Sequence, residues 1–233
     1  FLAPMGDVGS DLVEVGHGPL RFGFWVERHL ALRIVGPVDG AQMLERFTAE
    51  LTTLAGAVYQ AQGAEDLQRI LLEIAAAEGF KQVIAAGKNP SGLEIKSLFT
   101  SGGVTVATPA DFRDRESLRE AAFTVDAGIT FADFAVAETG TVGIIFSKDQ
   151  PRLASIAPPI HIAIVDIEKL YPVYEDVISQ VFGNKNNIPG QFAFITGPST
   201  SSDIQAINFK GMHGPTKVIV IFMMENRRKV EKK

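Results

Sequence analysis

The sequence contains no cysteine. This absence excludes disulfide bonds, cysteine nucleophiles, and iron–sulfur or zinc sites built on thiolates of this chain. The four histidines do not form a His-Glu-x-x-His motif or a comparable metal-ligand spacing. We therefore expect no metal site on this chain.

Long apolar runs and a strong charge of one sign are also lacking. No segment approaches the roughly 18 apolar residues of a membrane span, and the start of the chain has neither a basic n-region nor an apolar h-region. The net charge of −5 gives no reason to expect nucleic acid or an anionic membrane as a partner. With 46% hydrophobic and 21% charged residues, the composition is that of a globular protein, which we expect to be cytoplasmic.

The pattern of apolar residues divides the chain in two. Residues 1–37 are irregular and punctuated by glycine and proline, which suggests an N-terminal arm, and residues 38–233 carry the regular pattern of one domain. In the first part of that domain, helical and strand-like segments alternate at short intervals. The expected helices are 39–56, 65–79 and 92–103, and the expected strands are 57–61, 81–87 and 104–108. This alternation predicts an α/β fold with parallel pairing and helices on the faces of the sheet.

The alternation of expected helices and strands ends at about residue 114, and strand-like runs then follow one another with little helix between them. The expected strands are 128–137, 141–146, 161–165, 191–196 and 216–223, and the expected helices are 115–126 and 172–183, the latter with Pro172 in its first turn. We therefore expect a mixed sheet flanked by helices.

The stretch "FAVAETGTVGIIF", residues 134–146, places Glu138 among apolar strand residues. A carboxylate in such surroundings is costly unless it is paired or its protonation state is used. One interpretation is a tight hairpin in which Glu138 pairs with an arginine, such as Arg152, or with a backbone amide. The other is a binding site in which Thr139, Gly140 and Thr141 accompany the carboxylate.

A second candidate is "FITGPSTSSDI", residues 194–204, in which a strand leads into Gly197, Pro198 and a run of hydroxyl side chains. At the start of a helix, exposed amides and hydroxyls bind phosphate or carboxylate. Simple helix capping is the alternative, and it needs only one hydroxyl. The run comprises Ser199, Thr200, Ser201 and Ser202, and Asp203 follows it.

Two histidines call for opposite interpretations. His213 lies between glycines in "GMHGPTK", next to Gly214, and this turn exposes its ring to a ligand, although a lone loop histidine is more often structural or solvated. His161 lies on an apolar strand and is expected to be a hydrogen-bonded core residue. Arg152, in "PRLASIAPPIHIAIVD", can neutralise an anion.

Four motifs, in their order and separation, resemble the LUD-domain proteins, in the branch of lactate-utilisation protein C. They are "AETGT", "RLASIAPPIHI", "ITGPSTSSDI" and "GMHGPTKVIV". The resemblance covers roughly residues 38–224. It implies a fold like that of the NagB, RpiA and CoA-transferase group.

The resemblance also implies a role in a system that oxidises L-lactate to pyruvate. Its iron–sulfur clusters are expected only on partner subunits, with no cofactor on this chain, which would bind a small carboxylate or phosphate-bearing ligand. Glu138 and His213 are the candidate catalytic residues. The candidate ligand-binding residues are Thr139, Gly140, Thr141, Arg152, Gly197, Pro198, Ser199, Thr200, Ser202, Asp203 and Gly214.

Two other functions stay open on the sequence. CoA-transferases of this fold group use a glutamate near a glycine at a strand end as nucleophile, which "AETG" loosely resembles, so the chain can be a stand-alone transferase or isomerase-like enzyme. Alternatively, it is a metabolite-sensing module without turnover.

Overall fold

The structure is a computed structural model that describes residues 39–87, 94–99, 102–183, 188–202, 208–211 and 213–224. The expected N-terminal arm, residues 1–37, and Asp203 lie outside the described residues. The division of the chain into an arm and a domain therefore stays a prediction.

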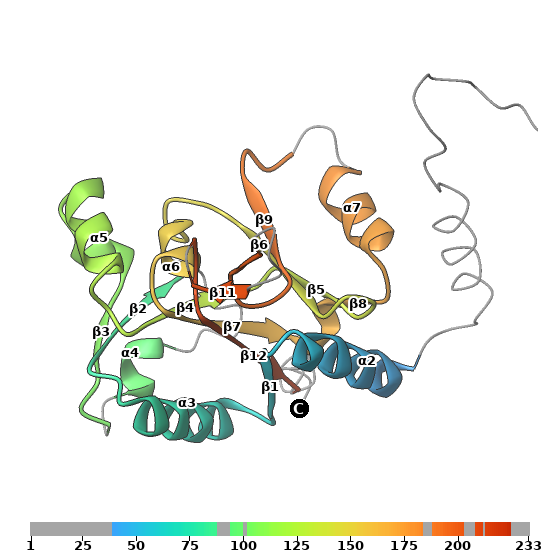
Figure 1. The fold of residues 1–233 in the computed structure, drawn as a ribbon, viewed down its shortest axis with the longest axis horizontal. Helices are drawn as coiled ribbons and strands as arrows, with labels where there is room; N and C mark the ends of the chain where they lie inside the picture. The colour runs from blue at the N-terminus through green and yellow to red at the C-terminus, as the bar shows by residue number, and fades with distance from the viewer. Residues whose placement is uncertain are drawn as a thin grey trace, which may run out of the picture. The chain divides into compact units, whose positions relative to one another are not determined.

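A six-stranded, wholly parallel sheet forms the centre of the fold (Figure 1). Its strand order is β1-β12-β7-β4-β2-β3. Most residues of the inner strands are apolar and buried, as expected when elements cover both faces of a parallel sheet. The strands are β1 (Ala57–Ala61), β2 (Gln82–Ala86), β3 (Thr105–Ala107), β4 (Ala127–Phe131), β7 (Ile160–Asp166) and β12 (Lys217–Met223).

Helices bury their apolar stripes on both faces of this sheet. Helices α3 and α4 pack in the hydrophobic cluster of one face, and α2 packs in the cluster of the other. Asp39 caps α2 by accepting a hydrogen bond from the amide of Ala41. The helices are α2 (Gly40–Thr53), α3 (Ala64–Glu78), α4 (Ile95–Leu98), α5 (Arg115–Ala122), α6 (Leu153–Ile156) and α7 (Tyr174–Phe182), with 3-10 turns at Pro109–Asp111 and Ile167–Lys169.

A smaller mixed sheet lies on the face that α2 covers, and α7 packs against its strands β5 and β8 (Figure 1). Its order is β8-β5-β6-β9, in which β5 pairs antiparallel with β6 and parallel with β8. A separate hairpin joins β10 to β11. The strands are β5 (Phe134–Val136), β6 (Thr141–Ile145), β8 (Leu170–Tyr171), β9 (Phe192–Ile195), β10 (Thr200–Ser202) and β11 (Asn208–Lys210).

The expected α/β class is confirmed, and several boundaries are corrected. Among the described residues of the expected helix 92–103, only Ile95–Leu98 are helical, and the expected helix 115–126 ends at Ala122. The run 128–137 is not one strand, because it divides into β4 and β5 in different sheets. The break falls at Asp133, whose carboxylate accepts a hydrogen bond from the Ile145 amide at 2.6 Å. Helix α7 begins at Tyr174 after an N-cap at Val173, so Pro172 precedes the helix instead of lying in its first turn.

Candidate functional site

Glu138 holds the start of helix α7. Its Oε1 accepts a hydrogen bond from the Tyr174 amide at 3.1 Å, and its own amide donates to the Pro172 carbonyl oxygen at 3.1 Å. The amides of a first helical turn have no partner within the helix, and the helix dipole favours a negative charge there. The hairpin interpretation, with Glu138 paired to a backbone amide, therefore describes the geometry of this carboxylate.

A chain of hydroxyl groups lies beside Glu138. The fully buried Thr141 accepts a hydrogen bond from the Tyr174 hydroxyl at 2.8 Å, and its Oγ1 lies 2.9 Å from the hydroxyls of both Thr139 and Thr196. These bonds join the β5–β6 hairpin to β9 and α7. Thr139 and Thr141 are thus hydrogen-bonded to each other, and their role in ligand binding stays a prediction.

The glycines of the two predicted loops both face the C-terminal end of α2. A Cβ on Gly140, which has φ +63°, would lie 2.5 Å from the Leu51 backbone nitrogen. A Cβ on Gly197 would lie 3.2 Å from the Cβ of Leu54. The loops that carry Glu138 and Ser199 are therefore anchored on the same helix end.

Ser199 joins the hydroxyl-rich turn to the turn that carries His213. Its amide donates to the Pro215 carbonyl at 2.8 Å, and its carbonyl accepts from the Gly211 amide at 2.9 Å. Its Oγ accepts a hydrogen bond from the His213 amide at 3.4 Å, and a Cβ on Gly214 would lie 3.3 Å from its own Cβ. The His213 side chain is exposed beside this junction.

The residues after Ser199 do not begin a helix. Thr200–Ser202 form β10, which pairs antiparallel with β11, so the helix start that both interpretations assumed is not formed by these three residues. Anion binding by the turn itself stays a prediction. The chain turns back because Thr200 pairs with Lys210 and Ser202 with Asn208. The Thr200 hydroxyl donates to the Pro198 carbonyl at 3.3 Å.

Among the described residues, the hydrogen bonds of Arg152 are made with Ser155 and not with Glu138. Arg152 is exposed and precedes α6, where its carbonyl accepts bonds from the Ser155 amide and hydroxyl at 3.0 and 2.9 Å. Within the described part of the chain, no ion pair joins it to Glu138.

His161 is a core residue with one satisfied nitrogen. Its Nε2 lies 2.8 Å from the Thr130 hydroxyl, and its Nδ1 has no hydrogen-bond partner among the described residues. Burial lowers the pKa of this fully buried imidazole to about 4, so the ring is neutral at pH 7.

The sequence motifs missed a cavity of about 350 Å³ at the carboxyl ends of β2 and β4. Its residues come from segments whose sequence shows no shared motif, and only the register of the parallel sheet brings them together. They are Ala85, Gly87, Glu94, Ile95, Lys96, Thr108 and Phe131.

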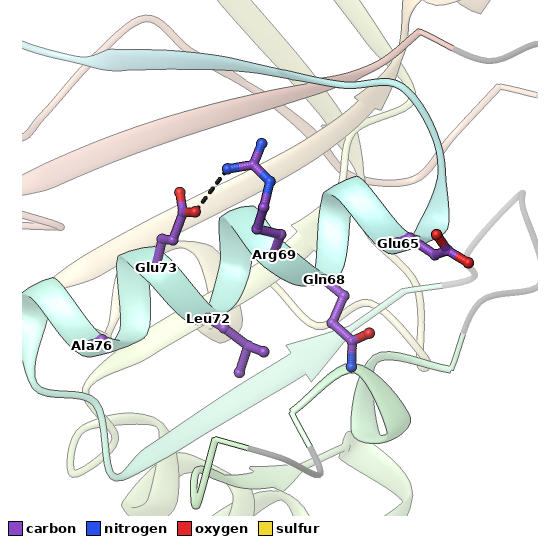
Figure 2. Close-up of a pocket in the computed structure, with 6 residues that line it drawn as sticks. All are labelled: Glu65, Gln68, Arg69, Leu72, Glu73 and Ala76. Carbon is purple, nitrogen blue, oxygen red and sulfur yellow. Dashed lines mark hydrogen bonds and ion pairs between the residues drawn. The ribbon is translucent and has the colours of Figure 1, made fainter.

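A second hollow, of about 490 Å³, runs along the outer side of α3. Figure 2 shows its side chains, all from one helix, with Arg69 directed toward Glu73 and joined to it by an ion pair of 2.7 Å. Arg69 also pairs with Asp66, and the Gln68 amide donates to the Leu98 carbonyl at 3.0 Å. Since these polar groups bind one another, this hollow is a salt-bridged helix surface.

Comparison with known proteins identifies the family. The model of the LUD domain matches residues 44–223. The chain belongs to the LUD-domain family. The class of protein that the four motifs resemble is thus confirmed.

The LUD chain is similar to curated proteins named Lactate utilization protein C. It is 35% identical to that of Bacillus subtilis over 139 residues, which cover 56% of this chain and 57% of the relative. It is 38% identical to that of Oceanobacillus iheyensis over 99 residues, covering 41% and 42%. The alignments thus span about half the length of the relatives of this name.

A solved structure supports the LUD fold. A DUF162-family protein from Deinococcus radiodurans superposes with a TM-score of 0.57 and 20% identity, covering 81% of this chain and all of that one. Among the described residues of the LUD chain, none of the helices has the length and apolarity that crossing a bilayer requires.

Proposed function

We propose that this chain is a cluster-free accessory subunit of an iron–sulfur system that oxidises L-lactate to pyruvate. The observation that carries the proposal is its similarity, at 32–38% identity, to several proteins named Lactate utilization protein C. The chain has no cysteine, so the thiolates that hold iron–sulfur clusters belong to partner subunits. The proposed localisation of this subunit is the cytoplasm.

The proposed subunit binds a small carboxylate or phosphate-bearing ligand between the Ser199 and His213 turns. His213 and Thr200 are both exposed and both adjoin the half-buried Ser199, since Thr200 follows it in the sequence and the His213 amide donates to its Oγ. These groups supply hydrogen-bond donors for an anion. Glu138, Thr139 and Thr141 support the site by fixing the hairpin that packs beside it on α2.

The geometry of Glu138 favours an anchoring role over the nucleophilic role of the transferase alternative. The Glu138 Oε1 accepts a hydrogen bond from the Tyr174 amide at the start of α7, which gives this oxygen a structural partner. Attack through that oxygen would require the first turn of α7 to lose a hydrogen-bond acceptor.

Gene deletion in the native host tests the proposed role. We expect the deletion strain to lose growth on L-lactate while it grows normally on pyruvate, and the tagged chain to co-purify with subunits that contain iron and acid-labile sulfide. A complementing Ser199→Ala/His213→Ala variant is expected to retain the partners and to lose growth. Normal growth of the deletion strain on lactate, without any iron-containing complex, would overturn the proposal.

A further inference from the structure

Strand β9 forms an edge of the smaller sheet. Among the described strands it pairs with β6 alone, whereas β5 and β6 each have a neighbour on both sides (Figure 1). The strand at the opposite edge, β8, is only two residues long. An edge strand presents backbone groups that can pair with another chain, and proteins usually protect such edges with charged residues, with proline or by keeping the strand very short.

The pairing with β6 determines which backbone groups of β9 face outward. The Phe146 amide donates to the Gln191 carbonyl at 3.0 Å, so these two opposite residues form a hydrogen-bonded pair. Pairs of this kind alternate along an antiparallel ladder, so Ala193 is the next residue of β9 that bonds to β6. The amide and carbonyl groups of Phe192 and Phe194 therefore point away from β6, to the open side of the sheet.

The side chains at these two outward positions form an apolar surface. Phe192 and Phe194 lie on the same face of β9 with their ring centroids 5.4 Å apart, and both residues are half-buried. The Phe182 ring of α7 lies 5.4 Å from the Phe192 ring, and the Phe134 and Tyr174 rings lie 5.6 and 4.8 Å from the Phe194 ring. These contacts hold β9 in the fold and still leave part of both phenylalanines accessible.

The sequence around β9 is uncharged. Residues 188–202 contain no aspartate, glutamate, lysine, arginine or histidine, and β9 itself contains no proline, although the whole chain has a net charge of −5. Two copies of a protein with a net charge repel each other, and the repulsion is smallest where the surfaces that meet are uncharged. An uncharged and unprotected edge therefore favours a second copy of this chain over a partner with a strongly charged segment.

We propose that two copies of this chain associate by antiparallel pairing of their β9 strands about a two-fold axis perpendicular to the sheet. With the axis beside Ala193, Phe192 of each copy lies opposite Phe194 of the other. Each of these pairs exchanges two backbone hydrogen bonds, so four bonds use all the outward amides and carbonyls of the phenylalanines. The opposed rings form cross-strand aromatic pairs on the same face, and the two four-stranded sheets become one.

This association also acts on the strand that leads to the candidate site. In the pair of copies, β9 is held on one side by β6 and on the other by the partner's β9. Because β9 continues through Thr196 to Ser199, the second copy stiffens the segment that carries the Ser199 turn. The pairing does not depend on the role of the chain in lactate oxidation.

Sedimentation velocity of the full chain over a series of concentrations tests the association. We expect the mass to rise with concentration from that of the 25.1 kDa monomer to that of a dimer. Phe192→Pro removes one outward amide from each copy, and with it two of the four interchain hydrogen bonds, but it leaves the ladder to β6 intact. We expect this variant to dimerise at least about tenfold more weakly.

Gln60→Pro is the matched control, on the edge strand β1 of the larger sheet. The Met224 amide donates to the Ala61 carbonyl at 2.9 Å, so Ala61 faces β12 and the Gln60 amide faces the open side. Proline at this position changes an outward amide just as it does in β9. Dimerisation of Gln60→Pro is expected to equal that of the parent.

An introduced cysteine reports the register, because the chain has none of its own. Ala193 lies opposite its own copy in a non-hydrogen-bonded pair, whose Cα atoms are about 4.5 Å apart and within the range of a disulfide. Ala193→Cys is therefore expected to form a covalent dimer on mild oxidation. In Ile195→Cys the two Cα atoms are roughly 14 Å apart, and no covalent dimer is expected.

Three outcomes overturn the proposal. They are a chain that stays monomeric at every concentration with no covalent dimer of Ala193→Cys, a dimer that Phe192→Pro leaves unchanged, and a dimer that Gln60→Pro abolishes. Circular dichroism verifies that each variant is folded. If Phe192→Pro unfolds, Phe192→Lys replaces it, because lysine keeps the backbone amide and places like charges opposite each other at the edge, which is expected to weaken the dimer as well.

Discussion

At the scale of single residues, close backbone approach decides which positions tolerate a side chain. Gly140 and Gly79 both have a left-handed backbone, at φ +63° and +72°. A Cβ on Gly140 meets the Leu51 backbone, whereas nothing lies within 4 Å of a Cβ on Gly79. A glycine-to-alanine substitution therefore adds only backbone strain at Gly79, whereas at Gly140 it adds backbone strain and a steric contact with Leu51.

Replacing Gly140 with alanine is expected to destabilise the protein by about 2 kcal/mol or more, because strain at positive φ adds to displacement of α2. Gly79→Ala carries only the strain, about 1 kcal/mol. Urea unfolding followed by circular dichroism measures both. Equal losses in the two variants would contradict the close packing of Gly140 on α2.

At the scale of elements, helix α7 depends on a residue distant in the sequence. Val173, its N-cap residue, offers no side-chain hydrogen bond, and Glu138, 36 positions before Tyr174, supplies an acceptor to the first turn. The apolar face of α7 contributes Val177 to a cluster with Phe134 and Val136. The hairpin and the helix thus stabilise each other.

Glu138→Ala is expected to lower the free energy of unfolding by about 1 kcal/mol, because the first turn of α7 loses its acceptor. Glu138→Gln keeps an amide oxygen as acceptor and is expected to lose roughly half of that. Chemical unfolding gives the free energies, and hydrogen exchange of the α7 amides reports the local effect. If glutamine costs as much as alanine, a role of the charge itself is indicated.

At the scale of the whole molecule, the parallel sheet encloses a titratable group. His161 lies on β7, which pairs with β4 and β12, so protonation of its ring must occur inside the core or through unfolding. Its folded-state pKa of about 4 lies below the usual 6.5. In this interval the unfolded chain binds more protons than the folded one.

Stability is therefore expected to fall as the pH falls from about 6.5 to 4, by about 3 kcal/mol from this group. His161→Leu should lose this component, and His213→Asn, at an exposed histidine, should keep it. Urea titrations at several pH values measure the difference between each variant and the parent, in which the contributions of the carboxylates cancel. An unchanged slope in His161→Leu would contradict the assignment.

The sequence alone determined much of the fold. Apolar periodicity predicted the helices that became α2 and α3 and the strands that became β1, β2 and β12, because these segments bury one stripe or a continuous run. The motifs also indicated the family. Short-range chemistry is enough for such features.

Tertiary structure decided the rest. The hydroxyl run after Pro198 became β10 because pairing with β11 supplied backbone partners that no local pattern specifies. Glu138 received its partner from α7, and Lys96 and Phe131 came to line one cavity through the order of parallel strands. Hydrogen bonds and cavities between distant segments depend on register and strand order, and these are set by the packing of the whole sheet.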